Sequence, residues 1–283
     1  MRVVLAVLAA IIVTAPLPPA AGPRIPARVS VAFAQGAAPS AVVYEIKKAE
    51  RHDPGCPAGA DHFGCARITF EYPVIVRAPG PASAAAINRA VSEFLLWRLQ
   101  AAPFKDLNEE MALFMQWWRE AKSQDTTGSL APYWQERTIK VLYESPRVVS
   151  LEFQDNSFMG GPHPNFFSNY QNFDAVTGAV LRLGDILTPG YELPLTRIAE
   201  REFRKARKLA PDADLNQAGY QFEHNQFQLT TNYAVGPGGL TFLYNLYAIA
   251  SYAQGITELH IDYAWIRDLI RPDGPLASLR PVN

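Results

Sequence analysis

The side chains best suited to chemistry gather around one loop rich in glycine and proline. Residues 156–165 read NSFMGGPHPN and bring Ser157 close in sequence to His163. A hydrolase could use Ser157 as nucleophile and His163 as base, with Asp174 orienting the imidazole. The spacing does not demand this, because a histidine between two prolines is held rigidly and can satisfy loop carbonyls or pack on Phe166. Catalysis is therefore the alternative interpretation, and the leading expectation assigns no catalytic residue.

The same loop can instead form the rim of a binding surface. Its two glycines let the backbone turn, and aromatic residues follow it in the chain. We expect a groove between a β-sheet and the helices of 81–123, with the loop at its edge. The expected binding residues are Gly160, Gly161, His163, Asn165, Tyr170 and Tyr252.

Motifs of the common catalytic and cofactor-binding classes are absent from the sequence. It contains no G-x-S-x-G, no H-E-x-x-H, no P-loop and no dinucleotide fingerprint. The remaining histidines are scattered, with His260 in an expected strand and His224 in an expected loop. We therefore expect no cofactor and no metal ion.

The only two cysteines, Cys56 and Cys65, enclose a short segment rich in Gly, Pro and Asp. Outside the cytoplasm such a pair forms a disulfide, and closing so short a loop stabilises by roughly 2–3 kcal/mol. His52 and His62 flank the cysteines, so a metal site is the alternative. A Cys-x8-Cys spacing is unlike the usual zinc sites.

The first residues are typical of a secretory signal peptide. An apolar run covers 3–13, which is too short to cross a bilayer of ~30 Å as a helix. Cleavage after Ala34 would remove three arginines and change the formal charge from −1 to −4, and a cut nearer Ala20 and Ala21 is the alternative. So mild a charge argues against nucleic acid as a partner. We expect a periplasmic or secreted protein with no transmembrane segment in the mature chain.

Hydrophobic periodicity predicts strands and helices in an order typical of an α+β fold with mostly antiparallel sheets. The expected strands cover 42–49, 66–77, 134–145, 149–153, 166–173, 226–233, 240–244 and 256–261. The expected helices cover 83–100, 106–123, 193–208 and 264–270. Trp117 and Trp118 are adjacent on the second helix, and we expect both to be packed rather than one to be exposed for ligand stacking. Arginines and lysines on the helix of 193–208 form either a landing site for anionic glycan or lipid headgroups or, as we expect, a solvated surface.

The second half resembles the extracellular domain of RsiV-type anti-sigma factors, which is also the non-catalytic half of PdaC-type peptidoglycan deacetylases. The matching residues span 155–271: GGPHP at 160–164, NFD at 172–174, TG at 177–178, Leu181, Leu183, DIL at 185–187, Phe227, Leu229, GL at 239–240, Phe242, Tyr247, YA at 252–253, Gly255 and Tyr263. The first half looks like the companion domain that precedes it. The resemblance implies an α+β fold in two joined parts, working outside the membrane.

Two positions depart from the family pattern, with Ala248 where an acid is usual and Ser251 where a proline is usual. The resemblance implies peptidoglycan or an exported protein such as lysozyme as partner, but the missing acid and the basic helix weaken the case for a basic enzyme. We expect a non-enzymatic binding module of the cell envelope, with an esterase or amidase using Ser157 and His163 as the alternative. The expected organisation is a signal peptide (1–34), a linker (35–41), an α+β domain with the disulfide loop (42–150), a second α+β domain (151–271) and a tail (272–283).

Overall fold

The computed structural model describes residues 42–56 and 62–280, all within one compact unit. The expected signal peptide and linker, and the last three residues of the tail, lie outside the described residues. None of the described helices combines the length and apolar character needed to cross a membrane. The α+β fold class with mostly antiparallel sheets is confirmed.

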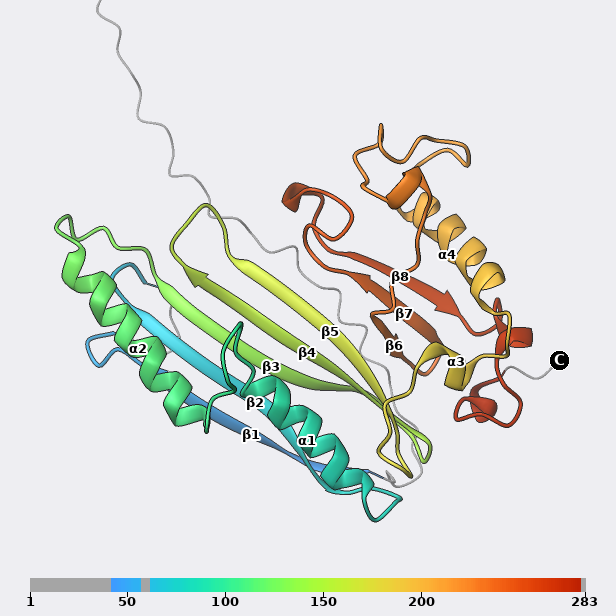
Figure 1. The fold of residues 1–283 in the computed structure, drawn as a ribbon, viewed down its shortest axis with the longest axis horizontal. Helices are drawn as coiled ribbons and strands as arrows, with labels where there is room; N and C mark the ends of the chain where they lie inside the picture. Colours follow the sequence, from blue (N-terminus) through green and yellow to red (C-terminus); the bar gives the residue numbers. More distant parts are fainter. Residues whose placement is uncertain (1–41, 57–61, 281–283) are drawn as a thin grey trace, which may run out of the picture. The chain divides into compact units, whose positions relative to one another are not determined.

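The first part of the chain builds a five-stranded sheet in the order β1-β2-β3-β4-β5 (Figure 1). Every neighbouring pair is antiparallel except β2 and β3, which run parallel because the helices α1 and α2 connect them. Its elements are β1 (Val43–His52), β2 (Ala66–Arg77), α1 (Ser83–Leu95), α2 (Leu107–Gln124), β3 (Tyr133–Glu144), β4 (Val148–Met159) and β5 (Asn165–Asp174).

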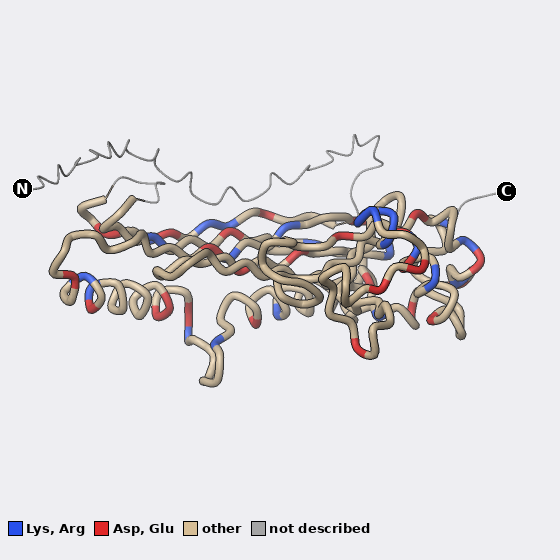
Figure 2. The backbone as a smooth tube through the Cα atoms, turned by 90° about the horizontal axis from the view of Figure 1, so that it is seen from above, with Lys and Arg blue, Asp and Glu red and all other residues tan. Residues whose placement is uncertain are grey.

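Both helices cover the same face of this sheet (Figure 2). Alternate residues of the strands are apolar, so one face of the sheet and one stripe of each helix share a core. Trp118 and Phe114 from α2 fill the space above Phe70 and Phe153, and all four are at most 1% exposed. The expected groove between sheet and helices is therefore wrong, because these side chains occupy it. Trp117, by contrast, is 44% exposed, so the two tryptophans are not both packed.

The second part forms a three-stranded antiparallel sheet, β6-β7-β8, with one long helix packed against it (Figure 1). Its elements are α3 (Leu183–Ile186), α4 (Glu192–Ala206), β6 (Tyr233–Val235), β7 (Gly239–Tyr244) and β8 (Thr257–Asp262). The inner face of α4, made by Leu195, Ala199 and Phe203, is buried in this part's core.

Side-chain amides join the two sheets along the free edge of β5. Asn245 both accepts a hydrogen bond from the Ser168 N–H (2.8 Å) and donates one to the Ser168 carbonyl (2.9 Å). Asn232 accepts from the Tyr170 N–H (2.7 Å) and also donates to Ser168. In return, the buried Asn172 amide donates to the Tyr233 carbonyl and accepts from the Val235 N–H, each at 2.8 Å. Asn232 and Asn245 thus supply hydrogen bonds that a sixth strand would otherwise supply, and Asn172 ties β5 to the backbone of β6.

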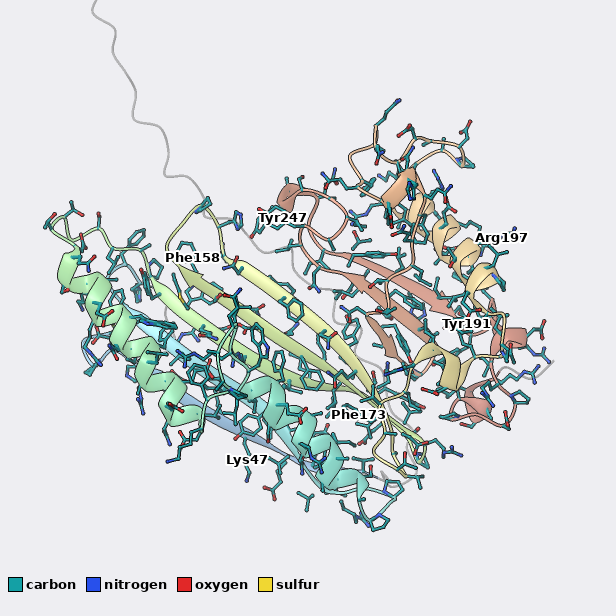
Figure 3. The ribbon with its side chains drawn as sticks, in the orientation of Figure 1. Lys47, Phe158, Phe173, Tyr191, Arg197 and Tyr247 are labelled. Carbon is teal, nitrogen blue, oxygen red and sulfur yellow. A yellow bond between two sulfur atoms is a disulfide. The ribbon has the colours of Figure 1, made fainter. Side chains whose placement is uncertain are left out.

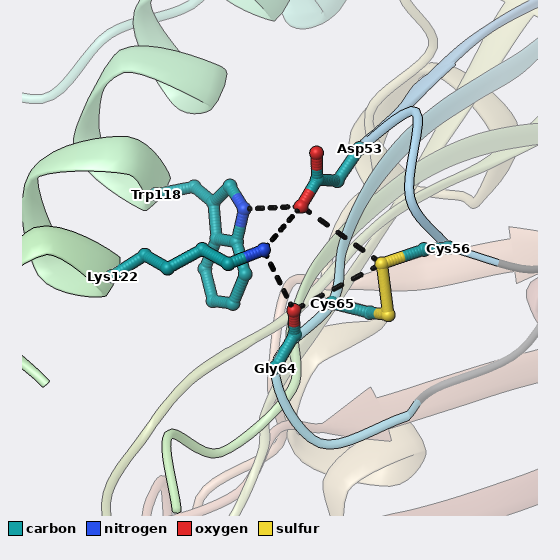
Figure 4. Close-up of a disulfide and its surroundings, with 6 residues drawn as sticks. All are labelled: Asp53, Cys56, Gly64, Cys65, Trp118 and Lys122. Carbon is teal, nitrogen blue, oxygen red and sulfur yellow. Dashed lines mark hydrogen bonds and ion pairs between the residues drawn. A yellow bond between two sulfur atoms is a disulfide. The ribbon is translucent and has the colours of Figure 1, made fainter. Parts of the chain in front are cut away.

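The disulfide loop is tied to helix α2 (Figure 4). Cys56 and Cys65 are joined, with their Cα atoms 5.7 Å apart, so neither thiol is free to bind a metal. Beside the bond, the Asp53 carboxylate accepts hydrogen bonds from Lys122 Nζ (2.8 Å) and Trp118 Nε1 (3.1 Å). The hydrogen bond from Lys122 is the largest influence that lowers the pKa of Asp53. Cys56 and Cys65 are thereby joined covalently, and the neighbouring Asp53 is held to α2 by hydrogen bonds and charge.

Two expected elements are wrong in detail. The stretch 226–232 is not a strand, because its polar groups bond elsewhere: Asn232 to β5, and the Gln228 carbonyl to the Tyr244 hydroxyl. The expected helix of 264–270 shrinks to a single 3₁₀ turn at Arg267–Leu269. The expected domain boundary at 150/151 falls inside β4, and the five-stranded sheet continues across it.

A buried charge cluster links α2 to the sheet. The Arg137 guanidinium contacts Glu110 Oε2 (3.0 Å), Asp155 Oδ2 (2.8 Å) and the Leu95 carbonyl (2.6 Å). Burial raises the pKa of Glu110 to about 7, because desolvation outweighs the attraction to Arg137. Asp155 gives Arg137 a second carboxylate partner in the same cluster.

Replacing Asn172 by alanine should destabilise the junction of the two sheets. The Tyr233 carbonyl, the Val235 N–H and the Ser150 hydroxyl would each lose a partner. Leaving such groups buried without a hydrogen bond costs on the order of 3 kcal/mol in total. Chemical denaturation measures the loss, and Asn169→Ala, on the same strand, should cost less than about 1 kcal/mol. Equal losses in the two variants would contradict the role given to Asn172.

Replacing Glu110 by glutamine should change how stability depends on pH. A carboxyl group whose pKa is higher in the folded protein than in the unfolded chain stabilises the fold at low pH. This contribution is lost as the pH rises from the ordinary pKa of 4.5 through the folded pKa of about 7. At about 1.4 kcal/mol per pKa unit the loss is on the order of 3 kcal/mol. Glu110→Gln should remove this loss, so the stability of the variant should rise relative to that of the parent as the pH increases from 4.5 to about 8. Glu93 is exposed, and Glu93→Gln should not change the pH dependence. Denaturation curves at several pH values test this, and parallel curves for parent and Glu110→Gln would refute it.

Candidate functional site

His163 lies in the loop between β4 and β5, and both of its ring nitrogens have partners. Nδ1 is 3.0 Å from the Pro164 carbonyl, and Nε2 is 2.9 Å from the Tyr247 hydroxyl. A carbonyl only accepts, so Nδ1 carries the proton in the neutral ring and Nε2 accepts from the tyrosine. The imidazole also stacks on the Tyr252 ring, with centroids 3.8 Å apart. We call His163, Tyr247 and Tyr252 the histidine–tyrosine patch.

The loop sequence fixes the position of the imidazole. Gly160 and Gly161 have φ values of 82° and 115°, a region that side chains with a Cβ disfavour. Pro162 and Pro164 then restrict the backbone on both sides of His163. The loop therefore presents the ring in one orientation, as the sequence suggested.

The second half of the patch comes from the loop between β7 and β8 (Figure 3). Tyr247 has φ = 62°, which is unusual for a residue with a side chain and costs roughly 1–2 kcal/mol. Asn245, two residues earlier, is bonded to both backbone groups of Ser168 and holds this loop against β5. Tyr247 is nevertheless 60% exposed. A strained, exposed aromatic residue held in place by its surroundings indicates a functional position.

The structure brings together some of the expected binding residues and not others. His163 and Tyr252 are in direct contact, Gly160 and Gly161 shape their loop, and Asn165 begins β5 at the end of that loop. Tyr170 does not belong with them. It is only 8% exposed, and its hydroxyl donates to Glu258 at 2.9 Å in the packed junction of the sheets.

Sequence reasoning missed Tyr247 as a site residue. It was part of the family pattern, but it lies 84 residues from His163 in the chain, and no local spacing relates the two. The usable signal was the pattern itself, in which Tyr247 and Tyr252 occur together.

The expected hydrolase arrangement is not assembled. Ser157 pairs with Asn165 at one end of β4 and β5, whereas Asp174 lies at the opposite end of β5. At ~3.3 Å per residue, Asp174 and Asn165 are about 30 Å apart along the strand. Both nitrogens of His163 are also engaged by Pro164 and Tyr247. Serine, histidine and this aspartate therefore cannot act together.

Asp174 has a structural role instead. Its carboxylate accepts hydrogen bonds from the N–H groups of Val176 (2.8 Å) and Thr177 (2.9 Å) and closes the turn after β5. Burial opposes its charge, but these hydrogen bonds and Arg147 outweigh burial and lower the pKa of Asp174. Gly178 completes the turn with φ = 76°. Among residues 42–56 and 62–280, no group of three or more His, Cys, Asp or Glu side chains is arranged to hold a metal ion.

Two family descriptions match adjacent parts of the chain. "Deacetylase PdaC" matches residues 62–166, which include β2 to β4, and "Protein of unknown function (DUF3298)" matches residues 184–264, which include α4 and the second sheet. The second match lies within 155–271, the range of the resemblance seen in the sequence. No curated protein matches the chain.

Two solved structures of DUF3298 family proteins are similar to this chain in fold. A DUF3298 family protein of Pseudomonas aeruginosa PAO1 has 24% identity and a TM-score of 0.61, with 86% of this chain and 98% of that chain covered. A DUF3298 family member of Bacteroides fragilis NCTC 9343 has 18% identity and a TM-score of 0.66, with 85% and 98% covered. The chain is thus similar in fold, over most of its length, to DUF3298 family proteins, and in sequence to the DUF3298 and PdaC families over one stretch each.

Proposed function

We propose that this chain is an exported, non-enzymatic binding module that recognises cell-wall glycan through the histidine–tyrosine patch. The observation that carries the proposal is the exposure of Tyr247, whose hydroxyl is fixed by His163 while its ring remains open to solvent. A rigid aromatic surface of this kind suits a ligand that binds by stacking.

The chemistry of the patch fits a sugar. The carbon–hydrogen face of a pyranose packs on an aromatic ring and hides apolar surface, while tyrosine and histidine keep polar atoms at the ring edge. The exposed Asn165 stands at the end of the same loop, and its amide offers both donors and acceptors to hydroxyl groups. The patch therefore offers stacking together with hydrogen bonding.

Three observations support a periplasmic or secreted location. The sequence predicts a signal peptide at 1–34. Cys56 and Cys65 are paired, which favours an oxidising compartment. The resemblance to RsiV-type anti-sigma factors and PdaC-type peptidoglycan deacetylases implies work outside the membrane, and the peptidoglycan substrate of the latter favours a glycan ligand here.

The hydrolase alternative has little geometric support, because Asp174, the carboxylate expected to orient His163, lies at the opposite end of β5 from Ser157. An exported protein such as lysozyme is the other alternative partner. Lysozyme is a basic enzyme, and the basic helix α4 does not complement its charge.

Replacing Tyr247 by alanine should weaken binding to purified peptidoglycan sacculi by about tenfold, since one exposed stacking ring and its hydroxyl are lost. Cosedimentation of the mature protein with sacculi measures this. Tyr44→Ala removes a tyrosine that is 37% exposed on β1 and should have no effect.

Three results would contradict the proposal. One is equal binding by parent and Tyr247→Ala. Another is hydrolysis of nitrophenyl esters or peptidoglycan fragments that His163→Ala abolishes. The third is capture of lysozyme by a protein that does not bind sacculi.

A further inference from the structure

We propose a second binding site, on the outer side of α4 and the turn after β8, that takes a saccharide carrying carboxylate or phosphate groups. It shares no residue with the histidine–tyrosine patch and does not depend on the function proposed for that patch.

The first part of this site is a cavity of about 590 Å³ between α4 and the segment that follows β8. Small-molecule sites usually measure ~300–1,000 Å³ and combine apolar walls with a few polar groups. The cavity is lined by Pro194, Ile198, Ala264, Trp265, Ile266, Arg267, Asp268 and Leu269. Trp265 is 45% exposed, so its ring offers a stacking surface to a ligand in the cavity.

Arg201 links this cavity to a second one along the same helix. Its guanidinium carbon lies 5.9 Å from the centre of the Trp265 ring, and its side chain is 62% exposed. The second cavity, of about 410 Å³, is lined by Arg197, Glu200, Arg201, Arg204, Lys205, Leu209 and Pro211. In Figure 3, Arg197 lies on the side of α4 that faces away from the second sheet. An aromatic platform thus adjoins a row of cations.

Charge on this surface favours an anion. The segment 192–208 holds six Lys and Arg against three Glu, although the whole chain has a formal charge of −1. Arg204 is paired with Glu200 (2.8 Å). Glu202 is shared by Arg201 (3.1 Å) and Lys205 (3.8 Å), so two carboxylates face three cations. Guanidinium groups bind carboxylate and phosphate with paired hydrogen bonds. The uncompensated cations therefore give the site affinity for either group.

The same surface is unsuited to lying on a bilayer. An interfacial helix inserts its apolar face, but Leu195, Ala199 and Phe203 of α4 are at most 1% exposed under the second sheet. The first cavity is concave, and its rim carries Asp268, whose side chain is 95% exposed. Its carboxylate can accept hydrogen bonds from the hydroxyl groups of a sugar, which the acyl chains of a lipid do not offer. A polyhydroxylated ring with an acidic substituent fits the concave cavity, the hydrogen-bond acceptor Asp268 and the cations of α4.

Calorimetric titration of the full mature chain with tetragalacturonate tests the proposal. The parent should bind this acidic tetrasaccharide at least about tenfold more tightly than the neutral maltotetraose or inorganic phosphate. Maltotetraose has no anionic group for the arginines, and phosphate has no sugar ring to stack on Trp265. Binding should weaken as salt rises. Trp265→Ala and Arg201→Ala should each reduce the affinity about tenfold, whereas Trp265→Phe, which keeps a ring, should retain most of it.

Matched controls come from helix α2. Trp117 is 44% exposed, nearly the same as Trp265, and Arg119 is also exposed. Trp117→Ala and Arg119→Ala should leave the affinity within about twofold of the parent. Unchanged thermal melting of each variant would show that it is folded.

Several results would overturn the proposal. They are no binding of tetragalacturonate at millimolar concentration, unchanged binding by Trp265→Ala, or binding of phosphatidylglycerol vesicles without binding of the saccharide. Tyr247→Ala should leave tetragalacturonate binding unchanged. Loss of sacculus binding in that variant with tetragalacturonate binding intact separates the two sites, and a loss of both would overturn their independence.

Discussion

The structure depends on how the free edge of β5 is satisfied. An edge strand presents a row of unpaired N–H and carbonyl groups, which invites pairing with another chain. Here Asn232 and Asn245 supply amide groups to Ser168 and Tyr170, in the positions where a neighbouring strand would place its backbone. A primary amide carries the same donor and acceptor pair as a peptide group, which is why asparagine can replace a strand at single points.

This edge also determines where the two loops of the histidine–tyrosine patch lie. Asn245 is bonded to Ser168, three residues after the start of β5, and Tyr247 follows Asn245 by two residues. The loop that carries His163 ends where β5 begins. The same hydrogen bonds that close the sheet edge therefore bring the two loops together. Asn245 anchors to β5 the loop in which Tyr247 adopts its strained conformation.

Patterns local in sequence predicted much of the fold. The alternation in 66–77 and the apolar stripe from Leu107 onwards gave β2 and α2 to within a residue, because each element buries one regular face. The stretch 226–233 alternates equally well but is mostly irregular. Its polar residues bond to β5 and to Tyr244 instead of to a partner strand, and a single sequence does not reveal such distant partners. For the same reason His163 and Tyr252 were predicted separately, and their stacking was not.

The β7–β8 hairpin connects the two proposed sites. Tyr247 and Tyr252 lie in the loop before β8, and Trp265 follows its end, so roughly 17 Å of strand separates the two ends at ~3.3 Å per residue. Groups this far apart without common partners act almost independently. The histidine–tyrosine patch draws its polarity from an imidazole and tyrosine hydroxyls. The α4 surface draws its polarity from arginines on the side of the helix opposite to the buried Leu195 and Phe203. The two ends of one hairpin thus adjoin two surfaces of different chemistry, and the chemistry of each follows from its own side chains rather than from the fold they share.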